Sequence, residues 1–95
     1  LEPNGEIRCA TSVTDQGQGT LTGLRQIVGT TLGVGIDAVE IVSGDTTAAP
    51  FGGGAWASRG TALGGESALR AARQLRTSIL TIAGSILQAQ PDSLR

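Results

Sequence analysis

Residues 15–22 combine glycines, glutamines and threonines in an order suited to holding an anionic ligand. Gly17 and Gly19 lack a Cβ, so the backbone there can turn tightly or lie directly against a ligand. The side-chain amide of Gln18, between them, can both donate and accept hydrogen bonds. A helical pattern opens at Thr20, and the free N–H groups at a helix N-terminus attract anions. The segment predicts a ligand loop, although a plain turn with a threonine cap has the same pattern.

Composition limits the classes of protein to which the chain can belong. Its 95 residues suit one small domain over residues 1–95. Seven basic residues and eight acids give a net charge of -1, which offers no basic surface to nucleic acid or membrane. There is no His, and Cys9 is the single cysteine, expected as a buried packing thiol, so we predict no metal ligands and no disulfide. The most apolar run, near residues 79–87, is too short to span a bilayer, and we expect a cytoplasmic protein.

Periodicity predicts the elements that must position the loop. Alternation and apolar stripes indicate a strand over residues 6–13, a helix over 20–33, a strand over 37–43 and a helix over 61–88. Ile7, Cys9 and Val13 share one face of the first strand. The order is therefore strand, helix, strand, helix.

A long connection without periodicity, residues 44–60, separates the second strand from the second helix. Loops longer than about 12 to 15 residues are uncommon in compact domains and are often functional. We expect Phe51 and Trp56 to anchor this one, although Trp56 could instead stack near a cofactor or substrate.

Two features suggest that the chain is cut from something larger. The turn signal Pro-Asn-Gly at residues 3–5 has only two residues before it, so we expect a hairpin partner strand to lie outside the chain. The apolar flank of the last helix, around Leu80 and Leu87, has no obvious cover. Open sheet edges and this flank predict self-association.

Three motifs in order carry a resemblance to a known family. They are Asp-Gln-Gly-Gln-Gly at residues 15–19, Gly-Asp-Thr at 44–46 followed by Pro50, and Ala-Ser-Arg at 57–59. Together they resemble the molybdopterin-binding large subunit of the xanthine dehydrogenase, aldehyde oxidase and carbon monoxide dehydrogenase family, particularly its bacterial carbon monoxide dehydrogenase-like members. The resemblance covers almost all of residues 1–90.

The resemblance implies a fold and a set of cofactor contacts. The fold is α+β in two layers, with helices packed on one face of a small mixed sheet. The contacts to molybdopterin, or to its dinucleotide form, fall on Gln16, Gly17, Gln18, Gly19, Ala57, Ser58, Arg59 and Gly60. Many relatives carry Ser where this chain has Gly60, so we expect no hydroxyl contact there. Arg59 could contact phosphate, or it could be a solvated cap charge or pair with Asp45 or Glu66.

The resemblance also implies a parent enzyme, a molybdenum hydroxylase that oxidises a carbon centre with water as oxygen source. Its partners would be the remainder of the subunit and iron–sulfur and FAD subunits or domains. The family's catalytic glutamate lies in a later segment, so Glu40 and Glu66 are expected as surface carboxylates and the chain alone as inactive and without bound cofactor.

Two alternatives stay open. One is a non-catalytic structural or interaction module whose Gly-rich loops only pack. The other is a generic phosphate-binding domain, which is disfavoured because no Lys accompanies the loop as it does in a P-loop.

Overall fold

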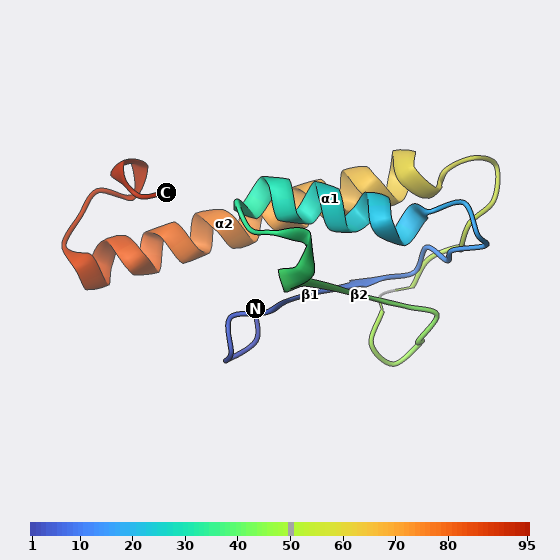
Figure 1. Cartoon of the computed structure of the whole chain (residues 1–95), viewed down its shortest axis with the longest axis horizontal. Coiled ribbons are helices and arrows are strands. Elements are labelled where there is room, and N and C mark those ends of the chain that lie inside the picture. Colours follow the sequence, from blue (N-terminus) through green and yellow to red (C-terminus); the bar gives the residue numbers. More distant parts are fainter. Residues whose placement is uncertain (50) are drawn as a thin grey trace.

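The computed structural model describes residues 1–49 and 51–95; Pro50, part of the second motif, lies outside the described residues. The main elements are β1 (Ile7–Thr11), α1 (Thr20–Leu32), β2 (Val39–Ser43) and α2 (Gly65–Leu87), as Figure 1 shows. Shorter helical turns occur at Ile36–Ala38, Gly60–Gly64 and Pro91–Ser93, of which the second is a π-helix.

The two strands are parallel neighbours, in a register that pairs Ile7 with Val39 and Thr11 with Ser43. Parallel strands need a crossover connection, which α1 supplies. Both helices lie on the same side of the strands (Figure 1), so the predicted two-layer α+β fold in strand-helix-strand-helix order is confirmed. The prediction of a mixed sheet also required an antiparallel strand. The described residues contain two strands, which are parallel, and no antiparallel strand.

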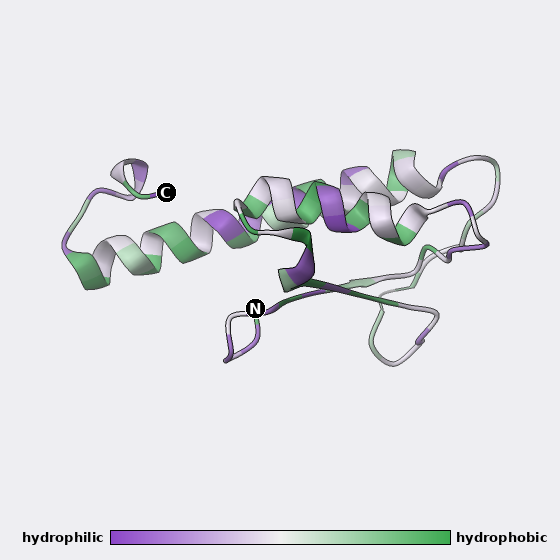
Figure 2. Cartoon of the chain, viewed as in Figure 1, coloured by the Kyte–Doolittle hydropathy of each residue, from purple (hydrophilic) through white to green (hydrophobic). Residues whose placement is uncertain are grey.

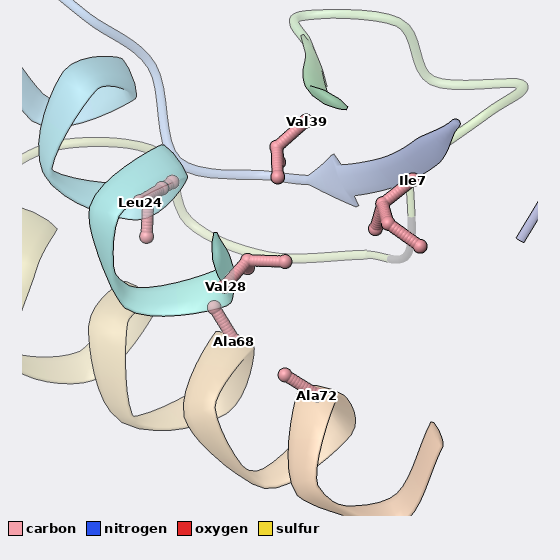
Figure 3. Packing of buried hydrophobic residues seen from close by; sticks show 6 residues of the cluster. All are labelled: Ile7, Leu24, Val28, Val39, Ala68 and Ala72. Atoms are coloured by element: carbon pink, nitrogen blue, oxygen red, sulfur yellow. The ribbon is translucent and has the colours of Figure 1, made fainter. Parts of the chain in front are cut away.

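A small aliphatic core joins the two layers. Figure 3 shows side chains from the sheet, from α1 and from α2 converging; the buried cluster consists of Ile7, Leu24, Val28, Val39, Ala68 and Ala72. The side chain of Cys9 packs beside this cluster and is partly buried, and burial raises the pKa of its thiol. Cys9 therefore has the packing role that the strand pattern predicts.

The predicted elements exist, but their boundaries differ where glycines or turns intervene. Helix α1 ends at Leu32, followed by Gly33 in a left-handed conformation, as expected for a helix C-terminus. The strand predicted over residues 37–43 begins only at Val39, because a 3-10 turn closes before it through a hydrogen bond from Ala38 N–H to the Gly35 carbonyl. The helix predicted over 61–88 divides into the π-helical segment Gly60–Gly64 and α2.

Close packing explains why the π-helical segment is rich in glycine. A Cβ at Gly64 would lie 2.7 Å from Cγ2 of Val13, and one at Gly65 would lie 2.9 Å from Cδ1 of Ile27. Any larger residue would push the segment away from the loop after β1 and from α1. Gly64 and Gly65 thus let the start of α2 approach that loop and α1.

The second half of α2 extends past α1 and the sheet (Figure 1) and carries apolar residues along its surface (Figure 2). Ile82, Ile86 and Leu87 are 62%, 74% and 64% exposed. Leu87 lacks cover as predicted, whereas Leu80 is partly buried. Among the described residues, no helix is both long and apolar enough to cross a membrane.

We expect Gly64→Ala to destabilise the chain, because the added Cβ would overlap Val13 and overpacking costs about 1–3 kcal/mol. Gly23→Ala is the matched control. A Cβ at Gly23 meets nothing within 4 Å, and alanine should stabilise α1 by up to about 1 kcal/mol. Urea unfolding followed by circular dichroism measures both. Effects of the same sign would contradict the packing described for Gly64.

Candidate functional site

Two loops meet at the carboxyl ends of the parallel strands, where ligands commonly bind in such sheets. One loop joins β1 to α1, and the other leads from β2 to the π-helical segment. Between them lies an open cleft of about 530 Å³, here called the loop cleft. The predicted contacts that line it are Gln16, Gln18, Ser58, Arg59 and Gly60. The predicted contacts Gly17, Gly19 and Ala57 are in the same loops but do not line the cleft.

The carboxylate of Asp15 organises the first loop from within. Its Oδ1 accepts a hydrogen bond from Gly17 N–H at 2.7 Å, and its Oδ2 accepts one from Leu21 N–H at 3.1 Å. These bonds, that of Leu21 first, hold the pKa of Asp15 below its ordinary value. Gly17 and Gly19 permit this wrapping, because they take φ values of 97 and 79 degrees.

This arrangement corrects the sequence-based reasoning about α1. The first turn was expected to offer free N–H groups to an anion, with a threonine cap as the alternative. Instead Gly19 is the N-cap without a side-chain cap bond, and Asp15 accepts the Leu21 N–H from outside the helix. The Asp15 carboxylate thus occupies part of the helix N-terminus. The N–H groups and the helix dipole attract it as they would attract a bound anion.

Gln18 presents donors to the loop cleft. Its side-chain Oε1 accepts a hydrogen bond from Gln16 N–H at 2.5 Å, which leaves its NH₂ group for a ligand. Behind it, Thr20 is 3% exposed and lies against Gly60, where a Cβ would approach Thr20 Oγ1 to 3.2 Å. The absence of a side chain at Gly60 therefore lets the two loops come together.

The second loop reaches the cleft through a strained turn. Ala57 and Ser58 both have φ of 54 degrees, in the left-handed region that non-glycine residues rarely adopt. Arg59 N–H closes the turn with a 3.3 Å hydrogen bond to the Trp56 carbonyl. Left-handed non-glycine residues persist where the surrounding structure enforces them, often at functional sites.

Hydrogen bonds fix the side chains on either side of this turn. Arg59 donates from Nε to the Gly54 carbonyl at 3.0 Å, and its guanidinium lies 4.6 Å from the centre of the Trp56 ring. Trp56 Nε1–H donates to the Gly53 carbonyl at 2.6 Å. Among the described residues, Arg59 hydrogen-bonds through Nε, and its terminal nitrogens are available to other acceptors.

The alternative that Arg59 pairs with Asp45 or Glu66 is wrong. Glu66 pairs with Arg70 at 2.7 Å, and Asp45 accepts hydrogen bonds from the Thr47 N–H and hydroxyl at 2.9 and 2.6 Å. These Thr47 bonds lower the pKa of Asp45. Asp45 lines a separate cavity of about 430 Å³ together with Gly44 and Thr46, so this described part of the second motif shapes the turn after β2 and does not line the loop cleft.

The expected aromatic anchors of the long loop are largely absent. Phe51 is fully exposed, and Trp56 is 62% exposed. Phe51 borders a cavity that the buried residues Val13 and Ala68 also line, but its own side chain stays exposed there. Instead of buried aromatic rings, the hydrogen bonds of Trp56 to Gly53 and of Arg59 to Gly54 hold the loop together.

The loop cleft has the electrostatic character of an anion site. Arg59 is the one charged residue among the described residues that line it, and Gln18, Ser58 and Thr61 add side-chain donors. Thr61 lines the cleft but was not among the contacts predicted from the sequence, and Trp56 was predicted mainly as a packing residue. The position of Thr61, close after the motif at residues 57–59, could have indicated its role.

A strand-helix-strand-helix unit with two Gly-rich loops around a donor-lined cleft is the architecture of a cofactor-binding domain. The chain belongs to the molybdopterin cofactor-binding domain family, whose model matches residues 1–95. The family predicted from the three motifs is thereby confirmed. The match favours cofactor binding over a module whose loops only pack and over a generic phosphate-binding domain.

Relatives with known names agree with this family. The carbon monoxide dehydrogenase large chain of Hydrogenophaga pseudoflava is 32% identical over 94 residues, covering 99% of this chain and 12% of the relative. Subunit gamma of the 6-hydroxypseudooxynicotine dehydrogenase complex of Paenarthrobacter nicotinovorans is 37% identical over 90 residues, covering 95% of this chain and 11% of the relative. The present chain therefore spans a small part of the length of these relatives.

A solved structure shows the same fold. The crystal structure of Cu,Mo-CO dehydrogenase in its carbon monoxide reduced state aligns with a TM-score of 0.89 at 33% identity. The alignment covers 100% of this chain and 12% of that one. The two-layer arrangement is therefore shared with an experimentally determined enzyme subunit.

We expect Asp15→Asn to lower the thermal unfolding temperature at neutral pH, because the variant loses the charged acceptor of the Gly17 and Leu21 N–H groups. The folded-state pKa of Asp15 is depressed, so its stabilisation is present above the unfolded-state pKa of about 3.9 and is lost as pH falls through the folded-state value. The difference from wild type should therefore close in acid. Calorimetry across pH measures this, with the exposed Asp92→Asn as control. A pH-independent difference would contradict the role of the Asp15 charge.

Proposed function

We propose that this chain forms one wall of the molybdopterin site in a molybdenum hydroxylase of the xanthine dehydrogenase and aldehyde oxidase type. The loop cleft would receive a phosphate group of the cofactor. The observation that carries this proposal is a cleft lined by Arg59 and side-chain donors, in a chain of this cofactor-binding family.

The residues present fit the cofactor's anionic part. Arg59 offers terminal nitrogens in a geometry that suits phosphate, and Ser58 offers a hydroxyl. The backbone changes hand between Ser58, with φ of 54 degrees, and Arg59, with φ of -94 degrees. Successive residues of opposite hand form concave N–H surfaces that bind anions. Gln18 would add its NH₂ group from the opposite wall.

In this role the chain's own residues bind and orient. The bound cofactor would supply a molybdenum centre that oxidises a carbon centre with oxygen from water. The described lining residues of the loop cleft include no carboxylate, thiol or imidazole that could move a proton. We therefore expect the chain alone to be inactive, with the general base contributed by another segment.

The partners proposed for the parent follow from its size and chemistry. The relatives are much longer than this chain, so the remainder of the subunit is the first proposed partner. Iron–sulfur and FAD subunits or domains would accept electrons from the molybdenum centre. A cytoplasmic location is part of the same proposal.

We expect Arg59→Ala to weaken binding of inorganic pyrophosphate at least about tenfold, because charge-assisted hydrogen bonds contribute about 1.5–3 kcal/mol. Isothermal titration calorimetry at low ionic strength measures this, and added salt should weaken wild-type binding. Arg73→Ala, an exposed arginine on α2, is the matched control and should bind like wild type. Equal affinities for the Arg59 and Arg73 variants would overturn the phosphate role of the cleft.

Self-association of the isolated chain follows from the exposed half of α2. Ile82 and Ile86 are one helical turn apart and largely exposed, so two copies can bury them against each other. We expect sedimentation to show concentration-dependent association that Ile82→Glu combined with Ile86→Glu abolishes. Thr77→Glu, on the opposite face of α2, should leave it unchanged. A wild-type chain that stays monomeric from low to high concentration would refute this expectation.

A further inference from the structure

We propose that the open face of Trp56 stacks on a flat heteroaromatic ring of the same ligand whose phosphate Arg59 holds. This inference rests on the proposed function and deepens it, because it makes Trp56 a specificity-determining residue. The ligand class it selects is a planar heteroaromatic ring joined to a phosphate.

The first observation is how Trp56 is held. Trp56 is 62% exposed and lines the loop cleft. One face of its ring lies beneath the Arg59 guanidinium at 4.6 Å, and the Nε1 edge is fixed to the Gly53 carbonyl at 2.6 Å. The exposed area therefore lies outside the face that Arg59 covers. An indole that is fixed in orientation and open on one face is a preformed stacking surface.

The second observation is the backbone that holds the pair together. The left-handed conformations of Ala57 and Ser58 turn the chain so that Trp56 and Arg59 lie one above the other. The run before them fits closely around the pair, since a Cβ at Gly53 would lie 2.3 Å from an Arg59 terminal nitrogen and 2.9 Å from Trp56 Nε1. Strain and close fit together indicate a geometry maintained for a ligand.

The third observation is that different residues of the cleft supply a positive charge, a flat apolar surface and hydrogen-bond donors. Arg59 supplies positive charge for a phosphate, and the indole supplies a flat apolar surface beside it. Gln18, from the first loop, lines the same cleft and supplies an NH₂ group, which donates hydrogen bonds of the kind that acceptors on a ring edge take. A planar heteroaromatic ring with hydrogen-bonding edges uses all three. Such a ring could belong to a pterin or to a nucleotide base, so the experiment includes both.

The only tryptophan of the chain is Trp56, so its fluorescence reports directly on the proposed contact. The 95-residue chain is titrated with inorganic pyrophosphate, with a nucleoside diphosphate and with a phosphorylated pterin, and calorimetry gives each affinity. We expect at least one ring ligand to bind about fivefold or more tighter than pyrophosphate and to quench Trp56 emission, since stacking on an aromatic side chain strengthens binding by at least this factor. The ring ligand that binds more tightly identifies the source of the ring.

Variants separate stacking from phosphate binding. Trp56→Ala should abolish the affinity advantage of the ring ligand over pyrophosphate, each affinity being measured on the same variant. Trp56→Phe should retain most of the advantage. The matched control is Phe51→Ala, an exposed aromatic of the same loop that does not line the loop cleft, and it should behave like wild type. Circular dichroism confirms that each variant is folded.

Each outcome decides between the two proposals. If all ligands bind equally, or if Trp56→Ala leaves the ring ligand's affinity unchanged, stacking is overturned while the phosphate site stands. If a folded chain binds neither pyrophosphate nor a ring ligand, the proposed cofactor cleft fails and the inference fails with it. A ring advantage that disappears in Trp56→Ala and persists in Phe51→Ala supports the inference.

Discussion

The hydrogen bonds from Gly17 and Leu21 N–H to the carboxylate of Asp15 are the interactions on which the site depends. They fix the loop after β1 and begin α1 at a defined residue. Helix α1 in turn carries Leu24, which is 1% exposed, into the core. Its first residue, Thr20, lies against Gly60 and so sets the position of the second loop. The Asp15 carboxylate thus links the loop, the helix and the cleft through two hydrogen bonds.

The hydrogen bonds to Asp15 also determine which hydrogen-bond donors each loop can offer to a ligand. The Gly17 and Leu21 N–H groups are bonded to Asp15 within the first loop, so this loop offers the cleft the side chain of Gln18. The positive charge and the backbone concavity come from the second loop, at Ser58 and Arg59. A negative charge within one wall is tolerable because several N–H groups surround it. Recognition therefore falls mainly on the strained turn.

The sequence patterns predicted those features that depend on neighbouring residues in the chain. The stripe of α1 and the glycine after it placed that helix within one residue, and the ordered motifs led to the correct family. Contacts between distant segments were not predictable in this way. The π-helical start of α2 depends on close approach to Val13 and Ile27, and Phe51 stays exposed although it borders a cavity that Val13 and Ala68 also line. The capping role of Asp15 was also missed, because an acceptor outside the helix leaves no periodic signal.

The most direct test of the division of donors is a titration of the isotope-labelled chain with inorganic pyrophosphate, followed by backbone and side-chain amide NMR. We predict that the largest shifts occur at the amides of Ser58 to Thr61 and at the Gln18 side-chain NH₂ group. The Gly17 and Leu21 amides, which remain bonded to Asp15, should move little. If the Gly17 and Leu21 amides show the largest shifts and the second loop stays unchanged, the anion binds at the α1 N-terminus and this division of donors is wrong.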